Sequence, residues 1–160
     1  MNDRINDMKR EAEISECGQY RYSLSRIWDE SKPTVLFIML NPSTADATRD
    51  DPTIRRCIDF AQRWNYGGLV VGNLFAFRAT KPQEMKMSKS PIGLRNDETL
   101  LRLAKESALV VAAWGKDGKH HQRDMKVRLM IPHLHYLKLT NKGQPYHPLY
   151  LPATLVPIPF

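Results

Sequence analysis

Cysteine is scarce in this sequence, with only Cys17 and Cys57 among 160 residues. The two lie far apart in the chain, which excludes a disulfide framework, a four-cysteine zinc site and an iron–sulfur cluster built from this chain alone. No run reaches the roughly 18 apolar residues that a membrane helix needs. The first 16 residues are polar and of mixed charge, unlike a secretion signal. We therefore expect a cytoplasmic protein that does not enter a membrane.

Several motifs of nucleotide-binding proteins and hydrolases are also missing. Neither G-x-x-x-x-G-K-[ST] nor G-x-G-x-x-G occurs, which argues against a P-loop and a dinucleotide fold. Ser43 does not stand in a G-x-S-x-G context, so a serine hydrolase triad is not indicated. His133 and His135 can share one face of a strand, but no third metal ligand is obvious. We expect neither a metal ion nor a cofactor.

What the sequence has is positive charge. It contains 24 Lys and Arg against 17 Asp and Glu, a formal net charge of +7. This balance favours a polyanionic partner such as nucleic acid, with a solvated basic surface as the alternative. The length and the 42% hydrophobic content are typical of one globular domain. We assign residues 1–16 to a flexible or loosely helical N-terminus and residues 17–160 to a single α/β domain.

Apolar runs of strand length predict a buried sheet. Three runs are continuous, which is typical of parallel strands covered on both faces, and a fourth alternates: residues 34–40, 69–75, 108–114 and 133–139. Residues 20–28 resemble a half-buried edge strand. Helices are expected from Pro52, capped by Asp50 or Asp51, from residue 96 or 97, and over residues 117–130.

These elements predict the fold. It is a three-layer α/β/α sandwich with a central, mainly parallel four-stranded sheet and an N-terminal edge strand. The segment from residue 140 onward is too rich in proline for regular structure. The long loop over residues 78–93 is expected to be functional or mobile.

Ligands of open parallel sheets bind beyond the carboxyl ends of the strands. Four segments of this sequence fall there, and each offers an amide, hydroxyl, imidazole or cation: residues 41–46, residues 73–78, Trp114-Gly115-Lys116 and residues 146–149. Ser43, Trp114 and Gly115 are therefore candidate substrate-binding residues. We expect the four segments to form one site.

The same segments carry a family resemblance. The words LNPSTAD, NLFAFRAT, VVAAWG and HPLYLP occur in this order. Together they resemble the uncharacterised family called domain of unknown function 1643, over roughly residues 20–160. That family is similar in layout to the uracil-DNA glycosylase superfamily, which implies a uracil-DNA glycosylase-like fold and a nucleic acid, DNA, as the partner.

The resemblance implies a role for Asn41-Pro42, which stands where those glycosylases have an Asp or Asn before a Pro that positions the attacking water. An amide cannot accept a proton at neutral pH, so Asn41 would orient the water and rely on stabilisation of the leaving base. Asp46 is the candidate general base, with capping of the approach to the helix as the alternative. A strand-ending turn is the alternative for Asn41-Pro42 itself.

Asn73 matches the asparagine that reads the base edge in the same superfamily, because an amide presents a donor and an acceptor together. Phe75 or Phe77 could stack on a flipped base, with a place in the core as the alternative. Arg78 would meet a phosphate or close an ion pair. All four are candidate substrate-binding residues.

His147-Pro148 resembles the segment whose histidine donates a hydrogen bond to the departing pyrimidine. Leu149 stands where that family has a phosphate-binding serine, and it could instead wedge apart the base stack.

The resulting prediction is an N-glycosidic-bond hydrolase that removes a modified or deaminated base in base excision. Two alternatives stay open. One is a catalytically inactive nucleic-acid-binding module of the same fold, and the other is an enzyme that acts on nucleosides or nucleotides.

Overall fold

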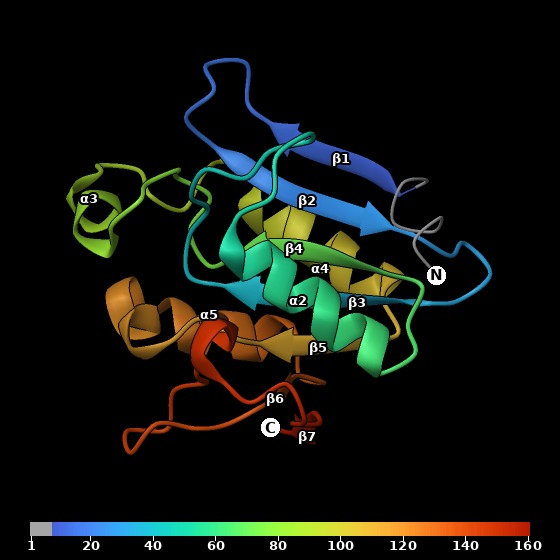
Figure 1. Cartoon of the computed structure of the whole chain (residues 1–160). Coiled ribbons are helices and arrows are strands. Elements are labelled where there is room, and N and C mark those ends of the chain that lie inside the picture. The colour runs from blue at the N-terminus through green and yellow to red at the C-terminus, as the bar shows by residue number, and fades with distance from the viewer. Residues whose placement is uncertain (1–7) are drawn as a thin grey trace.

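The structure is a computed structural model that describes residues 8–160, with β-strands and α-helices alternating along much of the chain (Figure 1). The strands are β1 (Lys9–Ile14), β2 (Arg21–Ile27), β3 (Thr34–Met39), β4 (Gly68–Asn73), β5 (Leu109–Ala112), β6 (His135–Tyr136) and β7 (Ile158–Pro159). The helices are α2 (Pro52–Arg63), α3 (Pro82–Met87), α4 (Asn96–Glu106) and α5 (Arg123–Met130), with the 3-10 helices η1 (Lys116–Gln122) and η2 (Pro148–Tyr150).

All seven strands belong to one sheet, in the order β1-β2-β4-β3-β5-β6-β7. Neighbours among β4, β3, β5 and β6 are parallel, whereas β1, β2 and β7 add antiparallel pairings at the two sides. The α/β class is confirmed. The expected count of four strands and one edge strand is wrong, because the antiparallel strands β1 and β7 extend the sheet at its two ends.

The apolar run of β3 shows why the sheet is buried on both faces. Val35, Phe37 and Met39 pack on one side with residues of α2. Leu36 and Ile38 pack on the other side with residues of α4 and α5. Side chains alternate along a strand, so a continuous apolar run needs a helix layer over each face. The expected three layers are present.

Helix α2 begins where the sequence predicted it. Asp51 is the N-cap, its carboxylate accepts from the backbone N–H of Ile54 at 2.9 Å, and Pro52 opens the helix. The helix then buries Cys57 and Phe60 against the sheet. The N-terminus of α2 therefore has a fixed place at the end of the 41–51 loop.

Three predictions of local structure are corrected. Residues 9–14, expected to be flexible or loosely helical, form β1, whereas residues 1–7 lie outside the described residues. Residues 20–28 contain β2, which is not an edge strand because β1 pairs with it. The proline-rich end of the chain contains η2 and β7. For β1 and β7 a neighbouring strand supplies the backbone pairing, where local composition gave no signal.

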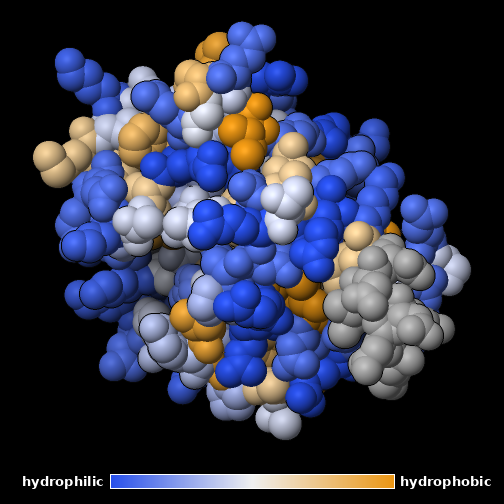
Figure 2. Space-filling view, turned by 45° about the horizontal axis from the view of Figure 1, so that its top comes forward, coloured by the Kyte–Doolittle hydropathy of each residue, from blue (hydrophilic) through white to orange (hydrophobic). Residues whose placement is uncertain are grey.

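The surface is mainly hydrophilic (Figure 2), as expected for a sequence rich in charged residues. On the face that Figure 2 shows, hydrophilic residues predominate and hydrophobic residues lie in small, separate patches. Within residues 8–160, no helix has the length and apolar character to cross a membrane.

Candidate functional site

A cavity of about 710 Å³ lies at the carboxyl ends of the parallel strands. In Figure 1 the arrowheads of β3 and β5 point to the side of the molecule where α3 lies. The cavity is lined from all four predicted segments, and the predicted site residues that it brings together are Asn41, Ser43, Asn73, Trp114, Gly115, His147 and Leu149. Segments more than 100 residues apart in the sequence thus meet at one sheet edge.

Asn73, the last residue of β4, is the most informative residue of the cavity. Its side chain is 2% exposed, and neither Oδ1 nor Nδ2 has a hydrogen-bond partner within the described chain. A buried amide without partners costs about 1–3 kcal/mol. Asn73 lines the cavity, so this unsatisfied donor and acceptor lie at its wall, where both atoms are covered from water.

The backbone around Asn73 is held firmly. Asn96, at the start of α4, is fully buried and donates from Nδ2 to the carbonyls of Asn73 and Leu74 at 2.8 and 3.0 Å. The buried Arg123 donates from Nε to the Leu74 carbonyl at 3.0 Å. These contacts fix the end of β4 and leave the Asn73 amide free.

Asn41 presents an acceptor to the cavity. Its Nδ2 donates to the carbonyls of Pro42 and Ala79, at 3.1 and 2.9 Å. Both amide hydrogens are used, so Oδ1 is the atom that can accept from water or a ligand. Pro42 is buried, and its carbonyl also accepts from the Ala79 N–H. Pro42 therefore shapes this turn and does not line the cavity itself.

His147 lies next to η2 and lines the same cavity. Burial lowers its pKa below the ordinary value, and the opposing attraction of Asp51 does not compensate. The ring is therefore neutral at pH 7. Nδ1 accepts from the Leu149 N–H at 3.3 Å, which places the ring proton on Nε2. His147 thus offers one hydrogen-bond donor.

The position of His147 depends on Gly115. Gly115 has a φ of +76°, a region that favours glycine, and its N–H donates to the Pro145 carbonyl at 2.7 Å. This bond holds the segment before His147 against the end of β5. Trp114 is buried, and its indole donates to Gln144 Oε1 at 2.8 Å, which ties the same two segments a second time.

The charged residues Asp51 and Arg21 of the cavity were not predicted as site residues. Asp51 lines it while capping α2, and Arg21 lines it from the start of β2. Burial lowers the pKa of the Arg21 guanidinium to about 10, which leaves it charged at pH 7, and the nearby Asp51 opposes that shift. Asp51 could have been found, because an N-cap at this edge faces the site. Arg21 could not, because its position depends on the antiparallel pairing of β2 with β4.

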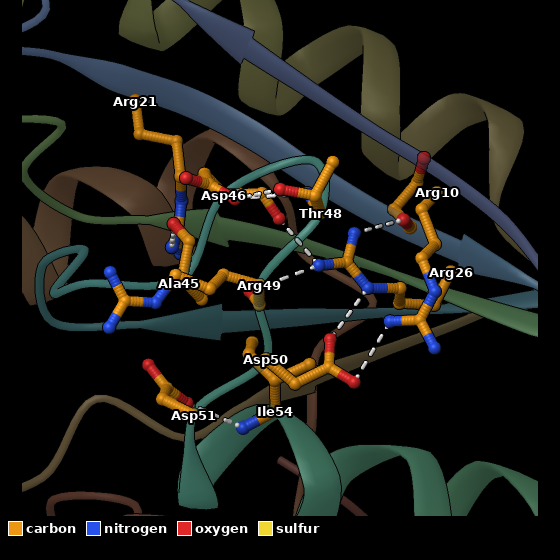
Figure 3. Close-up of polar contacts among 11 residues, drawn as sticks. Arg10, Arg21, Arg26, Ala45, Asp46, Thr48, Arg49, Asp50, Asp51 and Ile54 are labelled. Atoms are coloured by element: carbon orange, nitrogen blue, oxygen red, sulfur yellow. Dashed lines mark hydrogen bonds and ion pairs between the residues drawn. The ribbon is translucent and has the colours of Figure 1, made fainter.

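Buried arginines hold the loop between Asn41 and Asp51 (Figure 3). Arg21 donates from Nη1 to the Ala45 carbonyl at 2.9 Å. Arg26 is fully buried and donates from Nε to Asp50 Oδ1 at 2.8 Å and from Nη2 to the Asp46 carbonyl. The loop is thus fixed from β2.

Besides Pro42, four predicted site residues lie outside the cavity. The Asp46 carboxylate accepts from the N–H and hydroxyl of Thr48, so this residue shapes the loop. Phe75 is fully buried in the core, and Phe77 packs edge-on against Tyr20. Arg78 donates to the Gly18 carbonyl. None of the four lines the cavity that contains Asn73.

Fold and site together define the class: an α/β protein with a cavity, lined in part by polar side chains, at the carboxyl edge of its parallel strands. A family model described as "Protein of unknown function (DUF1643)" matches residues 21–149. The chain belongs to this family, which confirms that part of the resemblance. The comparison with curated proteins and the comparison with solved structures gave no match. The similarity to the uracil-DNA glycosylase superfamily stays a prediction.

Proposed function

We propose that the protein is an N-glycosidic-bond hydrolase of the uracil-DNA glycosylase type, which removes a modified or deaminated base from DNA. The observation that carries the proposal is the Asn73 side chain, buried in the cavity with its oxygen and nitrogen both unpaired. The edge of a uracil or hypoxanthine presents a donor next to an acceptor, and one amide complements both.

Asn41 and Asp51 supply the water chemistry in this proposal. Asn41 Oδ1 accepts a hydrogen bond from the attacking water. Asp51 takes the proton that the water loses, because a carboxylate can act as a base where an amide cannot. This assignment replaces Asp46, whose carboxylate is engaged with Thr48 outside the cavity.

His147 acts on the leaving base. When the bond between the sugar carbon and the base nitrogen breaks, its electron pair goes to the base, and the water oxygen forms the new bond to the sugar. Nε2–H of His147 donates to the base oxygen on which the negative charge accumulates. A preorganised donor at such a position contributes about 3 kcal/mol to catalysis.

Release of a base from DNA tests the proposal. The protein, in stoichiometric amounts, is incubated with single-stranded and duplex oligonucleotides that contain uracil, hypoxanthine or hydroxymethyluracil. Alkali then cleaves every abasic site formed. We expect cleavage at one of these bases, and loss of cleavage in His147→Ala.

The matched control is His133→Ala, because His133 is exposed and does not line the cavity. This variant should cleave like the wild type. Absence of abasic sites on every substrate would contradict the proposal, and DNA binding without base release would favour an inactive binding module.

A further inference from the structure

A second cavity, of about 850 Å³, adjoins the first. Both are lined by Gly115, Lys116, Asp117 and His147, so the two lie next to each other along one side of the molecule. The second cavity runs between α3, η1 and the loop before His147. We call it the lysine groove, lined by Lys86, Lys116, Lys119 and Lys142 together with Thr140, Asn141, Gln144 and Tyr146.

The charge of the lysine groove is largely uncompensated. Lys86 forms an ion pair with Asp117 at 2.7 Å. Within residues 8–160, Lys116, Lys119 and Lys142 form no ion pair with a carboxylate, and all three are exposed. Three free cations along one concave surface make a site for several phosphates of one strand.

The groove also offers an aromatic ring. Tyr146 is 38% exposed and lines the groove beside Lys142. The Lys138 ammonium lies 5.2 Å from the centre of the Tyr146 ring, and the Tyr146 N–H donates to the Lys138 carbonyl at 2.8 Å. The hydrogen bond holds the backbone of Tyr146, and the ammonium lies over the ring. An exposed aromatic ring among lysines is typical of surfaces on which unpaired bases stack.

We propose that the lysine groove binds single-stranded nucleic acid, namely the nucleotides that flank the one held at Asn73. This inference rests on the proposed function for the identity of the ligand. Lys116, Lys119 and Lys142 contact the phosphates, and an unpaired base stacks on Tyr146. Single-stranded DNA is favoured over duplex because a paired base cannot offer its face to the ring.

The test is binding of a fluorescent 15-nucleotide oligothymidylate, which contains no modified base, over a range of salt concentrations. The variant Lys116→Gln/Lys119→Gln/Lys142→Gln is compared with Lys9→Gln/Lys89→Gln/Lys105→Gln. The control removes the same charge from exposed lysines that do not line the groove. Each lost phosphate contact lowers the slope of log affinity against log salt by about 0.7, so we expect the groove variant to lower it by about 2.

We expect the groove variant to bind at least tenfold more weakly than the control variant, and Tyr146→Leu to bind about tenfold more weakly than the wild type. Equal slopes and affinities in the two triple variants would overturn the inference. So would equal binding of a duplex with the same sequence, or displacement of the oligonucleotide by an equimolar mononucleotide.

The two proposals fail separately. If the wild type releases a base while the groove variant binds like its control, the groove inference is wrong and the proposed function stands. If no base is released but the groove variant loses binding, the groove inference stands without the hydrolase.

Discussion

Asn96 donates two hydrogen bonds to the backbone at the end of β4, and one of them, at 2.8 Å, is to the carbonyl of Asn73. The Asn73 side chain itself has no partner among the described residues. The backbone that carries this amide is thus held in place, while the side-chain oxygen and nitrogen form no hydrogen bond with the described residues. Such an arrangement costs stability, and it is expected where a buried amide serves a ligand.

Replacing Asn73 with leucine should therefore separate stability from function. Leucine has a similar shape and no polar atoms, so the penalty of about 1–3 kcal/mol for the unpaired amide disappears. We expect the free energy of unfolding, measured in urea, to stay equal or to rise by about 1 kcal/mol. Base release should be lost. A fall of more than about 2 kcal/mol would show that the amide is bonded in the folded protein.

Two substitutions of Asp51 separate its role as the N-cap of α2 from its proposed role as the general base. Asparagine caps helices as well as aspartate does, whereas alanine costs about 1 kcal/mol at an N-cap. We expect Asp51→Asn to keep the unfolding free energy and Asp51→Ala to lose about 1 kcal/mol of it. Both should lower the rate of base release by about 100-fold or more, because both remove the general base.

For Asp51, stability is measured by urea unfolding and activity by single-turnover base release. If Asp51→Asn released the base at the wild-type rate, Asp51 would be a helix cap and nothing more.

The neutral state of His147 predicts the pH dependence of activity. Its pKa lies below the ordinary histidine value of about 6.5 because the ring is buried. Protonation would place a hydrogen on Nδ1, which now accepts from the Leu149 N–H. We expect base release to be independent of this group above pH 6.5 and to fall at lower pH.

Single-turnover rates measured from pH 5 to pH 8 show this fall in activity at low pH, the acid limb of the profile. His147→Gln keeps a donor but cannot titrate, so its profile should be slower overall and should lack the His147 limb. A limb centred above the ordinary histidine value would mean that the ring is not buried as the structure shows.

Arg26 and Arg10 provide a matched pair for the stability of the site loop. Both donate to Asp50, but the Arg26 side chain is fully buried and that of Arg10 is 31% exposed. Arg26→Met strips Asp50 of its buried partner and frees the Asp46 carbonyl, so we expect a loss of about 3–5 kcal/mol. Arg10→Met should cost at most about 1 kcal/mol. Urea unfolding compares them, and equal losses would contradict this ranking.

The same contacts give a pH dependence of stability. Burial raises the pKa of Asp50, but the hydrogen bonds and charges of Arg26 and Arg10 outweigh it, and the net shift is downward. This stabilisation is present above the unfolded-state carboxyl value of about 3.9 and is lost as the pH falls through the lower folded pKa. In Asp50→Asn this part of the acid destabilisation should be absent.

The centre of the fold could be predicted because continuous apolar runs such as β3 report burial on both faces. The edges could not. β1 is a charged segment held by backbone pairing to β2, and β7 is a two-residue strand in a proline-rich stretch. Pairing of this kind depends on where the neighbouring strand lies, and local composition does not encode it.

The candidate site, like the fold, could be predicted only in part. Asn41, Asn73 and His147 follow strands or stand in motifs, and the structure brings them together. Phe75 and Asp46 were correctly predicted to lie at the carboxyl edge of the sheet, but neither lines the cavity. The sequence does not say which way a side chain points once a strand has ended. Lys86 lies on the short helix α3 and Lys142 on a loop, and the positions of both depend on tertiary contacts.

The most direct test of the account is the detection of free base by mass spectrometry, after the wild type and Asn73→Leu are incubated with oligonucleotides that contain uracil or hypoxanthine. The account predicts release of one of these bases by the wild type and none by Asn73→Leu. The free energy of unfolding of the variant, measured in urea, should be no lower than that of the wild type. Equal release by the two proteins, or no release by the wild type at stoichiometric concentration, would contradict it.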